Sequence, residues 1–149
     1  MKKSIQKFSS ALLWAMCMTL AMQFFCGCDE KDDVAAEAYA GAYDVAQTIT
    51  SADGTTSEGA YRITVSVPDE NGREIEISNF MGYGASTVVH ATVKGNTFTI
   101  PKQTIYNLSV AAEIKGKGTK KGKTLTYTFD LDVEDGRHGS IRCVAVRDE

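Results

Sequence analysis

Hydrophobic and polar residues alternate with a period of two along most of the chain after residue 40. In the clearest segment, 125–133, Leu, Tyr, Phe, Leu and Val alternate with Thr and Asp. Such alternation is typical of a β-strand with one buried and one solvated face. Seven further segments follow the pattern: 43–49, 61–67, 74–78, 89–93, 98–100, 108–114 and 141–145. The chain is therefore predicted to contain eight strands.

Turn-forming residues separate these segments. Asp-Gly occurs at 53–54 and 135–136, and Asn-Gly occurs at 71–72. These pairs supply the positive φ angles that tight hairpins require. Eight strands at hairpin spacing predict an antiparallel meander, and closing it into an up-and-down barrel removes the exposed edges. We therefore expect an all-β, eight-stranded antiparallel up-and-down barrel, preceded by a short helical turn near residues 34–39.

One face of the predicted strands carries bulky side chains. Its members are Tyr61, Ile63, Val65, Ile75, Ile77, Phe98, Leu108, Tyr127, Phe129 and Leu131. Eight strands enclose space only for side chains or for one small ligand. The bulky set favours a largely filled interior. A local hollow beside Ala91, Ala112 and Ala145, able to hold a ligand, is the alternative.

The N-terminal segment has the order of an export signal. Three lysines precede an apolar run, 11–25, which is shorter than the roughly 18 residues of a membrane span. The run ends near Gly27-Cys28, which resembles the lipobox of bacterial lipoproteins. We predict cleavage after residue 27 and lipidation of Cys28, with simple secretion as the alternative. Cys26 is a weaker candidate because bulky Phe25 precedes it.

The segment after Cys28 is predominantly acidic, with four acidic residues and one lysine. They are Asp29, Glu30, Lys31, Asp32 and Asp33. They resemble the export signal of Bacteroidetes lipoproteins, which directs a protein to the outer face of the outer membrane; a solvated spacer is the alternative. Both interpretations make residues 28–39 a flexible tether. A Cys with more than one acyl chain would anchor the protein stably, so we expect an outer-membrane, surface-exposed lipoprotein.

The charge of the chain excludes one class of partner. Three lysines leave with residues 1–27, so 16 − 3 = 13 basic residues remain against 19 acidic residues. A net charge of about −6 argues against nucleic acid, which requires a basic face. The remaining length suits one domain, residues 40–149, which we expect to be a monomer.

The candidate chemistry is sparse. Cys143 would be the only cysteine of the mature domain besides Cys28, and its alternating context predicts a buried small hydrophobe rather than a reactive thiol. The two histidines, His90 and His138, belong to no catalytic or metal-binding motif. We therefore expect no enzyme activity, no catalytic residues, no metal and no cofactor.

Several short motifs occur in a characteristic order. They are Val93-x-Gly95-Asn96, Ile100-Pro101-x-Gln103, Gly116-x-Gly118 and Leu125-x-Tyr127, behind Gly41-x-Tyr43. This order resembles the small lipocalin-like (calycin-like) lipoproteins of Bacteroidetes. The resemblance implies an eight-stranded barrel on a lipid anchor and the binding of a small apolar molecule.

The same resemblance suggests a residue pair. Calycins usually carry Gly-x-Trp on the first strand, with a basic residue of the last strand packed over it. Here Tyr43 occupies the Trp position, and Arg142 or Arg147 could supply the basic partner through a cation–π contact.

The segment 79–85 is the most suggestive loop. Phe80, Met81 and Tyr83 could gate the barrel mouth or contact a partner, because two glycines make the loop pliable. Alternatively, the loop folds inward and plugs the barrel. Ile105 and Tyr106, in a connection between two later strands, could line the same mouth. Lysines crowd positions 115–123, where they could meet an anionic glycan or simply stay solvated.

Two functions therefore remain. In the first, a lipid-anchored barrel binds a small apolar ligand. In the second, a filled barrel serves as a structural or protein-interaction module, for example an inhibitor, with the loop around Phe80 as its contact.

Overall fold

The computed structural model describes residues 35–68 and 72–149. The predicted signal, Cys28 and the acidic residues that follow it lie outside the described residues. No helix within the described ranges is long and apolar enough to cross a membrane.

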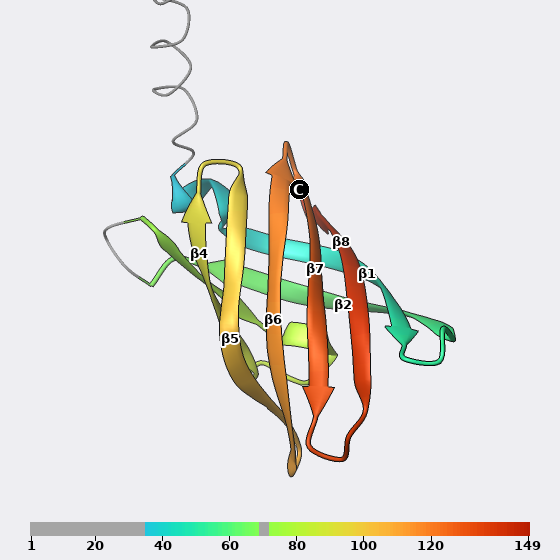
Figure 1. Cartoon of the computed structure of the whole chain (residues 1–149). Coiled ribbons are helices and arrows are strands. Elements are labelled where there is room, and N and C mark those ends of the chain that lie inside the picture. Colours follow the sequence, from blue (N-terminus) through green and yellow to red (C-terminus); the bar gives the residue numbers. More distant parts are fainter. Residues whose placement is uncertain (1–34, 69–71) are drawn as a thin grey trace, which may run out of the picture. The chain divides into compact units, whose positions relative to one another are not determined.

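The described residues form a closed antiparallel barrel (Figure 1). Its strands are β1 (Gly41–Ser51), β2 (Thr56–Ser66), β3 (Glu74–Ser78), β4 (Val88–Lys94), β5 (Thr97–Asn107), β6 (Val110–Lys121), β7 (Thr124–Val133) and β8 (His138–Arg147). Each strand pairs with the next, and β8 closes the barrel against β1. Two short 3-10 turns, η1 (Ala36–Tyr39) and η2 (Phe80–Gly82), complete the elements of these residues. The prediction of an all-β, eight-stranded antiparallel barrel is confirmed.

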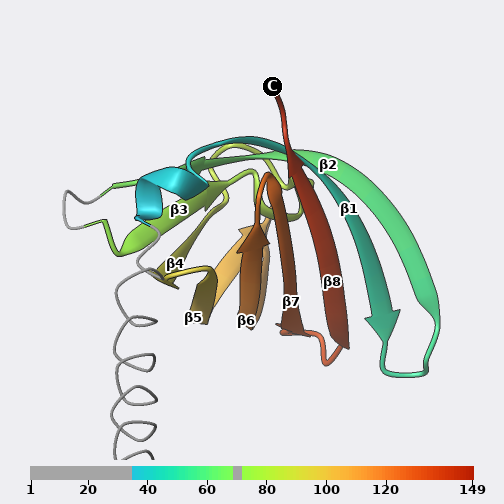
Figure 2. The same ribbon diagram turned by 90° about the horizontal axis from the view of Figure 1, so that it is seen from above.

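The two ends of the barrel differ. The end that carries η1, the β4–β5 and β6–β7 turns and the C-terminus is here called proximal. The opposite end, which carries the β1–β2, β5–β6 and β7–β8 turns, is called distal (Figures 1 and 2). Because β3 and β4 are shorter than the other strands, their connection folds across the interior rather than reaching the distal rim.

A column of aromatic rings fills the interior. Tyr39 of η1 meets Phe98 at 5.9 Å between ring centroids, and Phe98 meets Tyr127 at 6.0 Å. Tyr127 lies 6.3 Å from Phe129, and Phe80 of η2 lies 4.9 Å from Phe129. The column joins η1 to η2, so both 3-10 turns act as plugs.

Two inward-facing glycines make room for this column. An added Cβ at Gly118 would overlap the ring of Phe98, and one at Gly116 would overlap the backbone and side chain of residues 128 and 129. The Gly-x-Gly motif of β6 is thus explained by ring packing, because only glycine lets bulky rings lie directly on the strand.

Hydrogen bonds hold η1 in the proximal mouth. Ala36 and Tyr39 are fully buried, so the helical turn predicted near residues 34–39 packs into the barrel instead of continuing the tether. The Tyr39 hydroxyl donates to the Gly95 carbonyl at 2.8 Å, and the Tyr43 hydroxyl donates to the Tyr39 carbonyl at 2.7 Å. These residues therefore belong to the packed core of the barrel.

One inward position was predicted wrongly. Leu108 is 97% exposed, because Leu108 and Ser109 form the β5–β6 turn and the hairpin extends beyond the core. The alternation itself is sound, since Ala112 and Ile114 of the same segment are buried.

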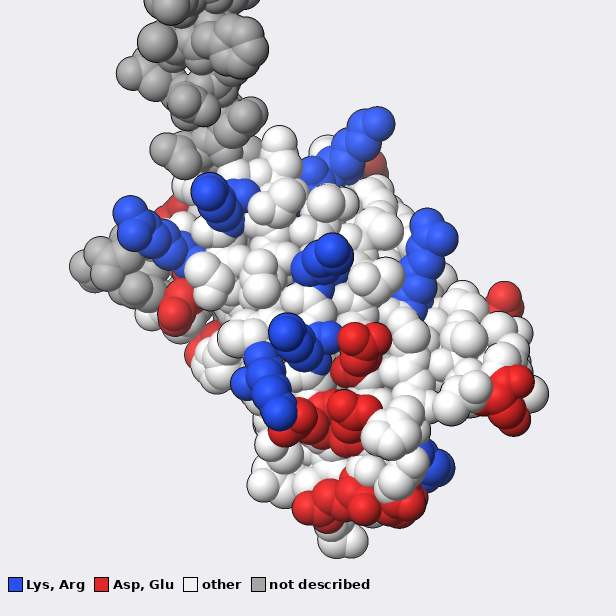
Figure 3. Space-filling model, viewed as in Figure 1, with Lys and Arg blue, Asp and Glu red and all other residues white. Residues whose placement is uncertain are grey.

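Charges are distributed unevenly on the face formed by β4–β7 (Figure 3). Lys and Arg lie mainly over the proximal half, and Asp and Glu gather toward the distal half. In the sequence, Lys120 and Lys121 end β6 and Lys123 lies in the exposed β6–β7 turn, whereas Asp130 and Asp132 lie in β7.

Candidate functional site

A surface groove lies at the distal end, between the β3–β4 connection and the end of β5. It has a volume of about 360 Å³, and its walls are Tyr83, Ser86, Thr87, Val88, Thr104, Ile105, Tyr106 and Leu108. Three residues singled out from the sequence, Tyr83, Ile105 and Tyr106, are brought together here.

The other two residues of the predicted loop point elsewhere. Phe80 is fully buried in the aromatic column, and Met81 is 8% exposed beside it. The β3–β4 connection thus combines both interpretations of the sequence. Its first half plugs the barrel, and Tyr83 in its second half lines an outer groove.

Asn79 fixes the shape of this connection. Asn79 and Met81 have φ angles of 58° and 57°, in the left-handed region that few residues other than glycine adopt. The Asn79 side chain donates to the Arg62 carbonyl at 2.6 Å and accepts from the Gly84 N–H at 2.7 Å. Asparagine tolerates this backbone conformation, so the strand–loop junction is held rigidly. Sequence reasoning missed Asn79 because its partners are distant in the chain.

The β5–β6 hairpin tip exposes apolar side chains. Leu108 is almost fully exposed, Tyr106 is 62% exposed and Val110 is 41% exposed. We call Tyr83, Tyr106, Leu108 and Val110 the distal surface. Leu108 also has a φ of 56°, at a position of a two-residue hairpin turn where glycine, asparagine or aspartate is preferred. Neither turn geometry nor solubility accounts for leucine here.

β5 carries a β-bulge against β6 beside the groove, close to the point where its pairing with β4 ends. Pairing between these strands ends at Thr92 and Thr99, and the register of β5 shifts between Ile100 and Gln103. The Gln103 side chain spans the gap: its carbonyl accepts from the His90 N–H at 3.0 Å, and its amide donates to the His90 carbonyl at 2.8 Å. The Ile-Pro-x-Gln run therefore forms a bulge, and its glutamine side chain connects β5 to β4. The sequence alone did not reveal this role.

The predicted calycin-like residues lie apart from the groove. Arg147 is the register partner of Tyr43, and its Nε would lie 2.7 Å from a Cβ added at Gly41. Glycine at 41 thus lets the Arg147 side chain cross the strand beside Tyr43. Burial raises the pKa of Tyr43, and the nearby Arg147 charge partly opposes this rise. Arg142 instead faces outward from the middle of β8.

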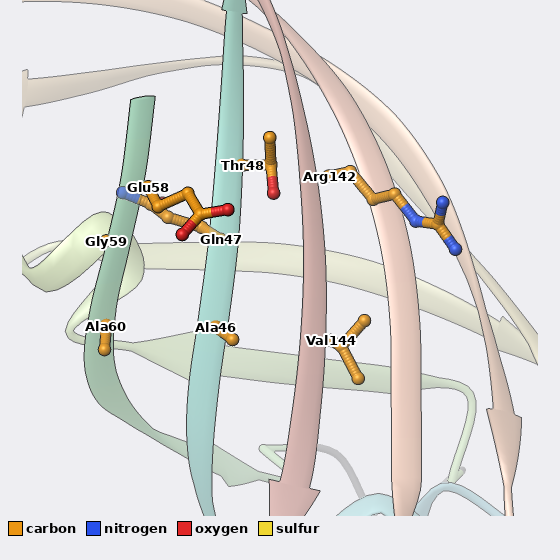
Figure 4. A pocket seen from close by; sticks show the side chains of 8 residues that line it. All are labelled: Ala46, Gln47, Thr48, Glu58, Gly59, Ala60, Arg142 and Val144. Carbon is orange, nitrogen blue, oxygen red and sulfur yellow. The ribbon is translucent and has the colours of Figure 1, made fainter. Parts of the chain in front are cut away.

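Arg142 borders a second outer groove, of about 620 Å³, over β8, β1 and β2 (Figure 4). Its lining residues are Ala46, Gln47, Thr48, Glu58, Gly59, Ala60, Arg142 and Val144. Ala46, Ala60 and Val144 are adjacent in register and form an apolar part of this groove. Its other side chains are polar or charged: Gln47, Thr48, Glu58 and Arg142.

Cys143 lies inside the barrel, as its alternating context predicts. Its Sγ is 3.7 Å from the Tyr61 hydroxyl, and burial raises the pKa of the thiol. A fully buried thiol with a raised pKa stays protonated at neutral pH and has little nucleophilic character. Among the described residues, no three His, Cys, Asp or Glu side chains cluster closely enough to hold a metal ion.

This chain has little similarity to known proteins. No family model matches the sequence, and no curated protein matches it significantly. Among solved structures, the barrel is similar to a protein of unknown function from the DUF3598 family of Nostoc punctiforme, with 12% identity and a TM-score of 0.48. The match covers 75% of this chain and 48% of the other, so this chain spans about half the length of that protein.

Proposed function

We propose that the protein is a lipid-anchored surface lipoprotein whose solid barrel presents its distal surface to a partner protein. The aromatic column supports this function most. Its rings fill the interior of the barrel, whereas the apolar side chains of the distal surface remain exposed to solvent. Exposed apolar groups around a groove are typical of interaction sites.

The attachment of the tether agrees with this arrangement. The described chain enters the barrel through η1 at the proximal end, where Ala36 N–H donates to the Gly72 carbonyl at 3.2 Å. A lipidated Cys28 would therefore be connected to the end opposite the distal surface.

The anchor can be tested separately. We expect the full chain to float with membranes and to gain the mass of its acyl chains after cleavage at residue 27. Cys28→Ser should yield a chain that stays in the aqueous fraction. Recovery of Cys28→Ser with membranes, or an unmodified wild-type Cys28, would rule out the lipid anchor.

The contact surface can be tested by photo-crosslinking in cells of the source organism. A photoreactive phenylalanine analogue at Tyr106 should give a discrete adduct. The same analogue at Thr128, exposed on the outer face of β7, serves as the matched control and should give none. Leu108→Asp should abolish the Tyr106 adduct without unfolding the barrel. No adduct, together with saturable uptake of a fluorescent fatty acid by the Cys28→Ser chain, would favour the small-ligand function instead.

A further inference from the structure

The distal parts of β4 and β5 lack a common hydrogen-bond ladder. Their pairing covers Lys94 to Thr92 on β4 and stops at Thr99 on β5, just before the bulge. Beyond this point β4 still pairs with β3, and β5 still pairs with β6. Each strand therefore has one side without a strand partner, and such a side presents free backbone N–H and C=O groups.

The hydrogen bonds of β4 show which residues face the gap. In an antiparallel ladder, residues two apart direct their N–H and C=O groups to the same side. The backbone groups of His90 face the gap, where Gln103 binds them, whereas the Val93 N–H donates to Arg73 on the β3 side at 2.7 Å. Val88, two residues before His90, therefore also directs its backbone groups into the gap.

The backbone groups of β5 alternate between its two neighbours in the same way. The Tyr106 carbonyl accepts from the Thr87 hydroxyl across the gap at 3.5 Å. Tyr106, and with it Thr104 two residues earlier, therefore face β4 rather than β6. We call the gap between residues 88–90 of β4 and 103–106 of β5 the β4–β5 slot.

The Gln103 amide indicates what fits this slot. It accepts from the N–H of His90 and donates to the carbonyl of the same residue. A neighbouring strand makes this pair of bonds with its own backbone. At one position of the slot, the Gln103 amide therefore takes the place of a peptide group of a neighbouring strand. Val88, Thr104 and Tyr106 lie beside this position. Tyr83 and Leu108 add apolar contacts on its flank.

We propose that the β4–β5 slot binds an extended segment of a partner protein as an added strand. The segment displaces the Gln103 amide from His90 and the Thr87 hydroxyl from the Tyr106 carbonyl, and it bonds to the backbone of Val88 and Tyr106. It lays apolar side chains against Tyr83 and Leu108. Addition of a strand to an unpaired edge is a recurrent mode of peptide recognition. This inference rests on the proposed function and specifies the chemistry of the partner.

The test uses a displayed library of short random peptides, selected on the mature Cys28→Ser chain. Synthetic copies of enriched peptides should slow amide exchange at Val88, Thr104 and Tyr106. N-methylation of the peptide nitrogens that face the slot should weaken binding about tenfold each, because each removes one backbone hydrogen bond. N-methylation at the intervening nitrogens should have a much smaller effect.

Two matched variants separate backbone from side chain. Tyr106→Pro removes the N–H that faces the slot and leaves the β6 ladder intact, whereas Tyr106→Thr removes the ring and keeps the N–H. Peptide binding should fall at least about tenfold further in Tyr106→Pro than in Tyr106→Thr. If Tyr106→Pro fails to fold, the N-methylated peptides still decide the question.

The inference is overturned if no peptide is enriched, if bound peptides tolerate every N-methyl group, or if protection falls outside the slot. Concentration-dependent dimers that protect the same amides would show that a second copy of this chain is the occupant, and would overturn it too. If it fails while the Tyr106 adduct persists, the distal surface contacts its partner through side chains alone. Saturable fatty-acid uptake without any adduct would instead contradict the proposed function itself.

Discussion

The proximal and distal ends of this barrel are built from the same strands, but they differ in their turn residues and in the pairing of their backbone hydrogen-bonding groups. At the proximal end, the tight turns carry Gly95 and Gly122, both with a φ of 60°, and a tyrosine hydroxyl caps a turn carbonyl. At the distal end, Gly54 and Gly136 serve two of the turns in the same way, but Leu108 adopts a similar φ in the third without being glycine, and the pairing of β4 with β5 stops short of this end. The difference indicates that the proximal end is built for stability, whereas the distal end retains features that stability alone would remove.

The largest expected effect concerns the column that connects the two ends. Gly118→Ala places a methyl group inside the Phe98 ring and should destabilise the protein by about 3 kcal/mol or more. Gly136→Ala, in the distal β7–β8 turn, is the matched control because its added methyl meets no neighbour. Its φ of 89° should limit the loss to about 1–2 kcal/mol. Urea denaturation measures both; equal losses would argue against a tightly filled interior.

A smaller effect should distinguish tyrosines at the two ends. Tyr43→Phe leaves the buried Tyr39 carbonyl without its donor and should lower the free energy of unfolding by about 1–2 kcal/mol. Tyr83→Phe at the distal groove should change it by less than about 0.5 kcal/mol. Thermal denaturation followed by circular dichroism compares the two variants. A larger loss from Tyr83→Phe would reverse the assignment of the stabilising end.

The distal turn should respond in the opposite direction. Leu108→Gly relieves the positive φ and should stabilise the barrel by about 1 kcal/mol. Because the exposed side chain is removed, the same variant should no longer form the Tyr106 photo-adduct. A more stable barrel that no longer crosslinks is the signature of a residue kept for function. A less stable barrel in Leu108→Gly would show instead that leucine supports the fold.

Replacing Tyr39 by Phe should change the pH dependence of stability, and the change should appear only at alkaline pH. Burial raises the pKa of Tyr39 to about 12 from an ordinary value of 10. A raised pKa in the folded state means that the stabilising contribution is complete below pH 10 and is lost as the pH rises toward 12. Tyr39→Phe should therefore reduce the fall in stability across that window while changing its pH profile below 9 little. Denaturation midpoints from pH 7 to 12 provide the measurement, and identical alkaline slopes would contradict the buried environment of Tyr39.

The sequence predicted the parts of this fold that depend on local patterns. Period-two alternation identified all eight strands, and Asp-Gly and Asn-Gly pairs marked several of the turns. The alternation pattern failed at Leu108. An apolar residue that continues the alternation of a strand is predicted to face inward, even where the hairpin extends beyond the core. Alternation reports which side of a strand is apolar, and it does not report where the core ends.

The candidate site was only partly accessible from the sequence. The apolar residues of the segment 79–85 identified Tyr83, and those of a later connection identified Tyr106. That the two lie beside the same groove depends on the inward fold of Phe80. The roles of Asn79 and Gln103 depend on backbone partners that lie 17 and 13 residues away in the chain. Polar side chains that bond to distant backbone carry no periodic signal, so no pattern in the sequence points to them.

The central claim is that side chains, and not a ligand, occupy the barrel interior. It is tested most directly by following the ring NMR signals of Phe98, Tyr127 and Phe129 in the mature Cys28→Ser chain during titration with a fatty acid. The account predicts that these signals stay unchanged, with any shifts confined to residues of the outer surface. Saturable shifts of the interior rings at a defined stoichiometry would contradict it.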